Sequence, residues 1–173
     1  MTHYPPDTLQ RAKSIRLVIF DVDGVLTDGK LYYTDTGEAC KAFHVHDGSA
    51  IKLLLNNGID VAIISGRESA SVLRRAAELG IQHVYQGAAD KLTALHDLSQ
   101  VTEIPPEHMA HVGDDLPDIS LFAAVGLAIA VANGHPVARN AASFVANAPG
   151  GQGVAADVCQ LILTAQDKWP YSQ

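Results

Sequence analysis

Five aspartates stand at two places in the sequence where they could bind a cation and exchange protons. Asp21 and Asp23 form a D-x-D pair, and a G-D-D-x-x-D segment contributes Asp114, Asp115 and Asp118. Carboxylates gathered at one site repel each other unless a cation lies among them. Hard oxygen ligands with room for water and phosphate are typical of Mg²⁺ sites. The set therefore predicts a magnesium site, whereas a single D-x-D pair is weak evidence because aspartates often cap helices.

An alternation of strands and helices must position these residues. Apolar, β-branched runs typical of buried strands span residues 15–21, 60–64, 83–86, 108–112 and 127–131. Helical patterns follow over residues 48–57, 69–79, 90–101 and 116–123, and a last helix is expected over 154–166. Repeated βα units with short connections predict an α/β fold, a three-layer doubly wound parallel sheet with helices on both faces.

Ligands of such sheets bind outside the carboxyl ends of the strands, so residues that directly follow a strand matter most. Four places in the sequence meet this condition: Asp21-x-Asp23, Ser65-Gly66-Arg67, Lys91 and Asp114-Asp115. We expect them to meet at one edge of the sheet.

A β-hairpin is the unusual element of the predicted fold. Residues 30–34 and 38–44 flank a turn-forming cluster at residues 35–37, and together they predict a hairpin that projects from the sheet. The chain has 173 residues, and at about 150 residues per domain we expect a single domain over residues 1–173.

Composition excludes several classes of protein. The chain has 12 Lys and Arg against 19 Asp and Glu, a net charge of −7, which argues against a surface that coats DNA or RNA. The longest nearly apolar run, residues 122–132, is much shorter than the roughly 20 residues of a membrane span. Residues 1–13 lack the apolar core of a secretory signal, and Cys40 and Cys159 suit reduced thiols. We therefore expect a soluble cytoplasmic protein with no nucleic-acid or membrane partner.

The ordered set D-x-D-G-V-L-T, S-G-R, Lys and G-D-D-x-x-D resembles the haloacid dehalogenase superfamily of phosphotransferases. The resemblance implies that Asp21 is the nucleophile and forms an aspartyl-phosphate. It also implies that Asp21, the backbone carbonyl of Asp23 and Asp114 hold Mg²⁺. The phosphate-binding residues that it implies are Ser65, Gly66 and Lys91.

Asp23 and Asp118 refine this expectation. An acid two positions after the nucleophile can protonate the leaving alcohol and then activate water, which favours a phosphatase. The sequence resembles neither the ion-pumping ATPases of the superfamily, which carry Thr at this position, nor its dehalogenases, which act on carbon. Asp118, one helical turn past Asp114, is expected to orient Lys91 or a metal-bound water. The alternative for Asp118 is an exposed acid in the first turn of a helix.

The segments 24–64 and 66–90 leave no room for the cap domain that many superfamily members insert there. This chain has the predicted hairpin, no cap domain and an F-x-V-x-D-G segment at residues 43–48. In these features it resembles the 3-deoxy-D-manno-octulosonate 8-phosphate (KDO 8-phosphate) phosphatase family. This resemblance implies a phosphorylated sugar-acid substrate in lipopolysaccharide synthesis and a homotetramer in which a neighbouring subunit completes the open site. The substrate-binding residues that it implies are His44, His46, Asp47, Gly48, Lys52, Arg67 and Arg75.

Two departures from the family pattern keep alternative substrates open. The family usually has Arg where His46 stands, and another Arg of its C-terminal segment is replaced by Ala156. A phosphatase for a nine-carbon ulosonate 9-phosphate, or a broad sugar-phosphate phosphatase, is therefore an alternative.

Three further interpretations are less favoured. His44 and His46 on one face of a strand would suit a metal site, but no third ligand is placed by spacing, so we expect polar residues of the hairpin that face substrate. A response-regulator receiver needs an Asp after its third strand, where this chain has Ser65. A non-catalytic domain for oligomerisation or regulation is disfavoured because every chemical position is intact.

Overall fold

The computed structural model describes residues 4–171, apart from the side chains of residues 38 and 39. Six strands form the main sheet: β1 (Leu17–Phe20), β4 (Asp60–Ile64), β5 (His83–Tyr85), β6 (Met109–Gly113), β7 (Leu127–Ala130) and β8 (Phe144–Val145). Their order across the sheet is β5-β4-β1-β6-β7-β8, and every neighbouring pair is parallel. The chain therefore builds outward from β1 in both directions, as predicted for a doubly wound sheet.

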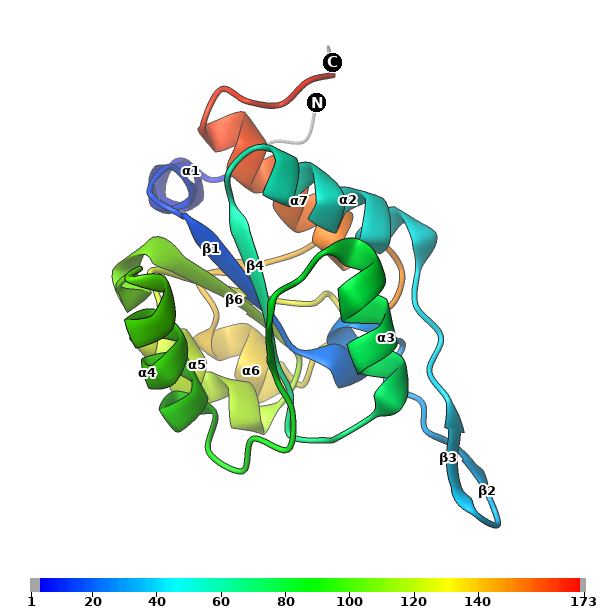
Figure 1. Cartoon of the computed structure of the whole chain (residues 1–173). Coiled ribbons are helices and arrows are strands. Elements are labelled where there is room, and N and C mark those ends of the chain that lie inside the picture. Colours follow the sequence, from blue (N-terminus) through cyan, green and yellow to red (C-terminus); the bar gives the residue numbers. More distant parts are fainter. Residues whose placement is uncertain (1–3, 172–173) are drawn as a thin grey trace.

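Helices cover both faces of the sheet (Figure 1). One face carries α1 (Pro6–Ala12), α2 (Val45–Asn56), α3 (Ala70–Leu79) and α7 (Val154–Ala165), and the other carries α4 (Lys91–Thr102), α5 (Ile119–Ala124) and α6 (Pro136–Ala141). Side chains of β1 alternate between two cores, with Val18 and Phe20 packed on the first face and Leu17 and Ile19 on the second. This alternation explains why the strand is apolar throughout.

Three short turns lie next to strands of the main sheet. An irregular turn, η1 (Val22–Leu26), follows β1, and two short 3-10 turns, η2 (Pro106–His108) and η3 (Leu116–Asp118), flank β6. Within the described residues, no helix has the length and apolar character needed to cross a membrane.

The hairpin projects from the sheet, but it is shorter than predicted (Figure 1). Its strands are β2 (Tyr32–Thr34) and β3 (Gly37–Cys40), which pair antiparallel in a sheet of their own. The second arm was predicted to reach His44 and the following helix to begin at residue 48. Instead α2 begins at Val45, because the His44 side chain caps it by accepting a hydrogen bond from the His46 backbone N–H.

Three elements were not predicted: α1, α6 and β8. Both helices are short and begin with a proline, Pro6 or Pro136, where the missing N–H costs nothing. Strand β8 has two residues, too few to show a period.

Candidate active site

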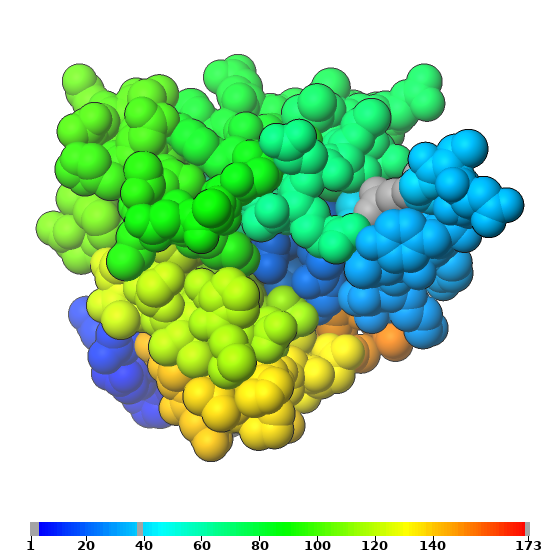
Figure 2. Space-filling model, turned by 90° about the horizontal axis from the view of Figure 1, so that it is seen from below, coloured from blue at the N-terminus to red at the C-terminus, as the bar shows by residue number. Residues whose placement is uncertain are grey.

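A cavity of about 570 Å³ opens at the carboxyl ends of β1, β4 and β6. Figure 2 shows this edge as a hollow with the segment after β1, in deep blue, at its floor. The sequence-predicted residues that line the cavity are Asp21, Asp23, Ser65, Gly66, Arg67, Lys91, Asp114 and Asp115. The structure therefore brings all four predicted segments together.

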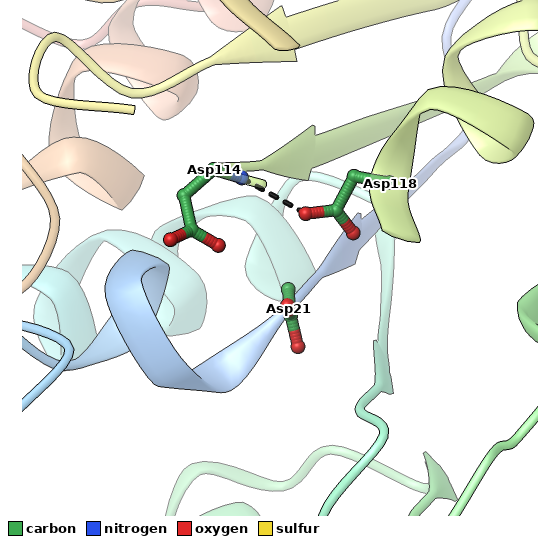
Figure 3. A group of neighbouring side chains, drawn as sticks. All are labelled: Asp21, Asp114 and Asp118. Carbon is green, nitrogen blue, oxygen red and sulfur yellow. Dashed lines mark hydrogen bonds between the residues drawn. The ribbon is translucent and has the colours of Figure 1, made fainter. Parts of the chain in front are cut away.

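Asp118 anchors the acidic segment rather than facing the cavity. Its side chain is fully buried, and its Oδ2 accepts hydrogen bonds from the backbone N–H groups of Asp114 (2.9 Å, Figure 3) and Asp115 (3.2 Å). A Cβ atom at Gly113 would lie 2.5 Å from the Asp118 side chain. Only glycine before Asp114 therefore leaves space for this anchor.

Lys91 joins the anchor to the first strand. Its Nζ lies 2.7 Å from Asp118 Oδ1 and 2.9 Å from Asp21 Oδ2. Burial lowers the pKa of Lys91, but the negative charges of Asp21 and Asp118 outweigh burial, so the net pKa is raised. Lys91 is therefore a fixed positive charge, which an anionic ligand would meet beside Asp21.

His111 completes this buried cluster. Its Nε2 lies 2.9 Å from Asp118 Oδ1, on the same oxygen that binds Lys91. Burial opposes ionisation of Asp118, but the bonds from His111 and Lys91 prevail and hold its pKa below the usual range. Nothing in the spacing of His111 along the sequence indicated this contact.

Asp21 and Asp114 have the chemistry of a cation site. One oxygen each from Asp21, Asp114 and Asp118 lie within 4.8 Å of one another. Both oxygens of Asp118, however, already accept hydrogen bonds from other groups of the chain. Burial, followed by the charges of Asp21, Asp118 and Asp115, raises the pKa of Asp114 to about 7. Burial also raises the pKa of Asp21, against the attraction of Lys91. A divalent cation between these carboxylates would offset both effects, so the residues present fit Mg²⁺.

Gly24 explains the glycine of the D-x-D-G motif. Its backbone has φ +91°, and a Cβ atom there would lie 2.0 Å from Asp114 Oδ2. A side chain at Gly24 would therefore displace the candidate metal ligand as well as strain the turn.

Asp23 lies in a second cluster, of which only Asp23 and Arg67 were predicted from the sequence. Lys41 Nζ contacts Asp23 Oδ1 and its side chain is 2% exposed, while Arg67 Nε lies 3.6 Å from Asp23 Oδ2. Arg67 also donates a 2.7 Å hydrogen bond to the hydroxyl of Tyr33 on the hairpin. Lys41 was missed because it follows the hairpin and belongs to none of the motifs, so no pattern connects it with Asp23.

Ser65 and Gly66 form the turn after β4. Ser65 is buried, its backbone N–H donates to the Tyr85 carbonyl, and its hydroxyl forms no hydrogen bond within the described part of the chain. The hydroxyl and the following backbone are therefore available to a ligand in the cavity.

The other residues assigned to substrate lie outside this cavity. His44, Asp47, Gly48 and Arg75 line a small apolar pocket between α2 and α3. Asp47 is buried in α2, and its carboxylate accepts N–H bonds from Gly153 (3.3 Å) and Ala155 (2.8 Å) at the start of α7, so its predicted role in substrate binding stays a prediction. Burial, against these hydrogen bonds, raises the pKa of Asp47.

His46 and Lys52 also lie away from the cavity. They line a groove beside α7 together with Ala156 and Trp169. The idea of His44 and His46 on one face of a strand is wrong, since both stand at the start of α2. Neither belongs to a cluster of potential metal ligands among the described residues. Their role in substrate binding stays a prediction.

Comparison with known proteins agrees with the fold and the site. Residues 83–157 match a family described as haloacid dehalogenase-like hydrolase. The chain is 49% identical over 162 residues to the 3-deoxy-D-manno-octulosonate 8-phosphate phosphatase of Yersinia pestis. The aligned residues cover 94% of this chain and 87% of that relative. The crystal structure of the protein from that organism has a TM-score of 0.92, with 94% of this chain and 88% of that chain covered.

Two further structures are described with bound ligands. One is the phosphatase of the same name from Moraxella catarrhalis in complex with magnesium, phosphate and KDO, 44% identical with a TM-score of 0.91 over 95% of this chain and 94% of that chain. The other is the cobalt-bound phosphatase from Haemophilus influenzae, which is 44% identical and has a TM-score of 0.90. The match covers 92% of this chain and 93% of that chain. This chain belongs to the 3-deoxy-D-manno-octulosonate 8-phosphate phosphatase family of haloacid dehalogenase-like hydrolases.

Proposed function

We propose that this chain is a Mg²⁺-dependent phosphomonoesterase that hydrolyses KDO 8-phosphate to KDO and phosphate in the synthesis of lipopolysaccharide precursors. The observation that carries the proposal is the position of Asp21 at the floor of the cavity, paired with Lys91 and close to Asp114. The likeness to the M. catarrhalis phosphatase, described with magnesium, phosphate and KDO, supports the substrate.

In the first half-reaction, a carboxylate oxygen of Asp21 attacks phosphorus. The bond from phosphorus to the ester oxygen breaks, its electron pair stays on that oxygen, and protonated Asp23 donates a proton to it. Lys91, the Ser65 hydroxyl and the backbone N–H of Gly66 bind the phosphoryl oxygens. The products are the free sugar acid and an aspartyl-phosphate on Asp21.

In the second half-reaction, water attacks the phosphorus and Asp23 accepts a proton from that water. The bond to the Asp21 oxygen breaks, which restores the carboxylate and releases phosphate, while Asp23 is again protonated. Mg²⁺, held by Asp21, Asp114 and the backbone carbonyl of Asp23, supplies positive charge that neutralises the phosphoryl oxygens.

We also propose that the working enzyme is a cytoplasmic homotetramer in which a neighbour completes the site. The supporting features are an open cavity without a cap domain and the exposed hairpin side chains Leu31, Tyr32 and Tyr33. His46 and Lys52 would serve substrate across such an interface. Sedimentation velocity with activity measured on each species tests this idea, and a fully active monomer would overturn it.

The decisive experiment is phosphate release with Mg²⁺ and with EDTA from KDO 8-phosphate, a nine-carbon ulosonate 9-phosphate, hexose phosphates and a nucleotide. A preference for KDO 8-phosphate that EDTA abolishes is expected. A flat but metal-dependent profile would keep the mechanism and remove the substrate. Absence of turnover on every compound would contradict the proposed function.

A further inference from the structure

We infer that Lys41 is a positioning residue, which fixes the carboxyl group of Asp23 so that Oδ2 faces the leaving oxygen of the substrate. The inference rests on the proposed function, since it concerns the acid and base that this function requires. The main evidence for this role is the contact between Lys41 Nζ and Asp23 Oδ1.

The two oxygens of Asp23 have different surroundings. Oδ1 accepts a hydrogen bond from Lys41 Nζ. Oδ2 is buried and accepts no hydrogen bond from the described residues, and Arg67 Nε lies 3.6 Å from it. A buried oxygen without a partner costs free energy and calls for an explanation. A leaving-group oxygen bound in the cavity would be the missing partner.

Lys41 is well placed to maintain this difference. Its side chain is 2% exposed, so its long stem is held by surrounding atoms and does not sweep through solvent. Arg67, the other cation near Asp23, is 44% exposed. An ammonium group held on Oδ1 therefore sets the rotation of the carboxyl group.

The hairpin delivers this ammonium group. Strand β3 ends at Cys40, and Lys41 is the next residue, before α2 begins at Val45. Asp23 lies in η1, on the other side of the hairpin in sequence. The hairpin thus has a function within its own chain, because its return arm sets the geometry of the acid that follows β1.

The test exploits leaving groups that do and do not need a proton. Release of the leaving group is measured under single-turnover conditions for KDO 8-phosphate, whose alkoxide must be protonated, and for p-nitrophenyl phosphate, whose phenolate need not be. For Lys41→Met we expect a loss of about 100-fold with KDO 8-phosphate and of about threefold or less with p-nitrophenyl phosphate. Lys41→Arg, which keeps a charged donor, should restore most of the rate with KDO 8-phosphate.

Controls separate this inference from the proposed function. Lys30→Met removes another lysine of the hairpin region, exposed and paired with Asp28, and should leave both rates unchanged. Wild-type enzyme without turnover would contradict the proposed function itself. If wild type is active and Asp23→Asn shows the leaving-group difference, equal losses on both substrates in Lys41→Met, or no rescue by Lys41→Arg, would overturn only the role of Lys41.

Folding of the variants is checked by circular dichroism and thermal unfolding. Lys41→Gln carries the same expectation as Lys41→Met and is used if the methionine variant does not fold. Failure of both neutral variants to fold would make Lys41 a residue of the fold and would also overturn the inference.

Discussion

Two ion-paired clusters flank the cavity, and they are built in different ways. In the first, Lys91, Asp118 and His111 come from α4, η3 and β6, and their side chains are 6% exposed or less. In the second, Lys41 and Arg67 come from the end of the hairpin and from the turn after β4, and they meet on Asp23. The first cluster is part of the packed sheet, while the second depends on a projecting element. We therefore expect damage to the first to lower both stability and activity, and damage to the second to lower activity with only a small loss of stability.

Asp21 lies between the clusters, and its loss has the largest expected effect. Asp21→Asn removes the nucleophile, so turnover should fall by roughly 10⁴-fold or more. Lys91 keeps its ion pair with Asp118, so the folded state should persist. Steady-state phosphate release and circular dichroism check both statements, and substantial residual turnover would show that another group attacks phosphorus.

The two clusters should contribute very differently to the free energy of unfolding of the protein. Asp118→Ala leaves Lys91 and His111 without their shared buried partner and should lower the free energy of unfolding by about 3–5 kcal/mol. Arg67→Ala removes a half-exposed cation and should cost about 1 kcal/mol or less. Urea unfolding of both variants makes the comparison. Equal losses would mean that the second cluster is as deeply built into the fold as the first.

Magnesium binding should depend on pH in the neutral range. Without metal the pKa of Asp114 is raised to about 7, so this group is mostly protonated at pH 6 and mostly ionised at pH 8. Mg²⁺ competes with that proton, so its affinity should fall by up to about tenfold per pH unit below pH 7. Calorimetry in two buffers of different ionisation enthalpy reports the released proton. An affinity that is constant from pH 6 to 8 would contradict the raised pKa.

The smallest effect is expected at the tip of the second cluster. Tyr33→Phe removes the hydroxyl that accepts the 2.7 Å hydrogen bond from Arg67. The ring remains, and the bond is exposed, so the expected change in stability is about 0.5 kcal/mol, within the range of a solvent-exposed hydrogen bond. Turnover should change by less than about threefold, since the roughly 0.5 kcal/mol expected for this exposed bond corresponds to a change of about twofold. A much larger loss of turnover would mean that the hairpin controls Arg67 as well as Asp23.

The same contrast describes what the sequence predicts. The strands and the longer helices were expected at nearly their observed positions. Apolar periodicity marks these elements directly, and so do C-cap residues such as Gly80 at the end of α3. Once the sheet was known to be parallel, the convergence of Asp21, Lys91 and Asp114 followed from the strand ends. Lys91 and Asp118 of the first cluster could therefore be predicted from the sequence, whereas the contact of His111 with Asp118 could not.

The second cluster could be predicted only in part, because Asp23 and Arg67 follow strand ends whereas the position of Lys41 depends on the path of the hairpin. The contact between Lys41 and Asp23 is set by where β3 ends and α2 begins, and a cap such as His44 moves that boundary by three residues. Asp47 illustrates a related problem. A polar residue in a motif suggested a ligand, whereas its partner is the start of α7, which no local pattern connects to it.

The bonds between Asp47 and α7 also bear on when this protein can fold. The carboxylate of Asp47 meets backbone groups 106 and 108 residues later in the chain. During synthesis, therefore, α2 leaves the ribosome long before its partner exists, and the apolar side of α2 that packs on α7 stays without this partner until α7 has been synthesised. Closure of the first face of the sheet is thus a late event of biosynthesis, and the nascent chain passes most of its translation time with this face incomplete.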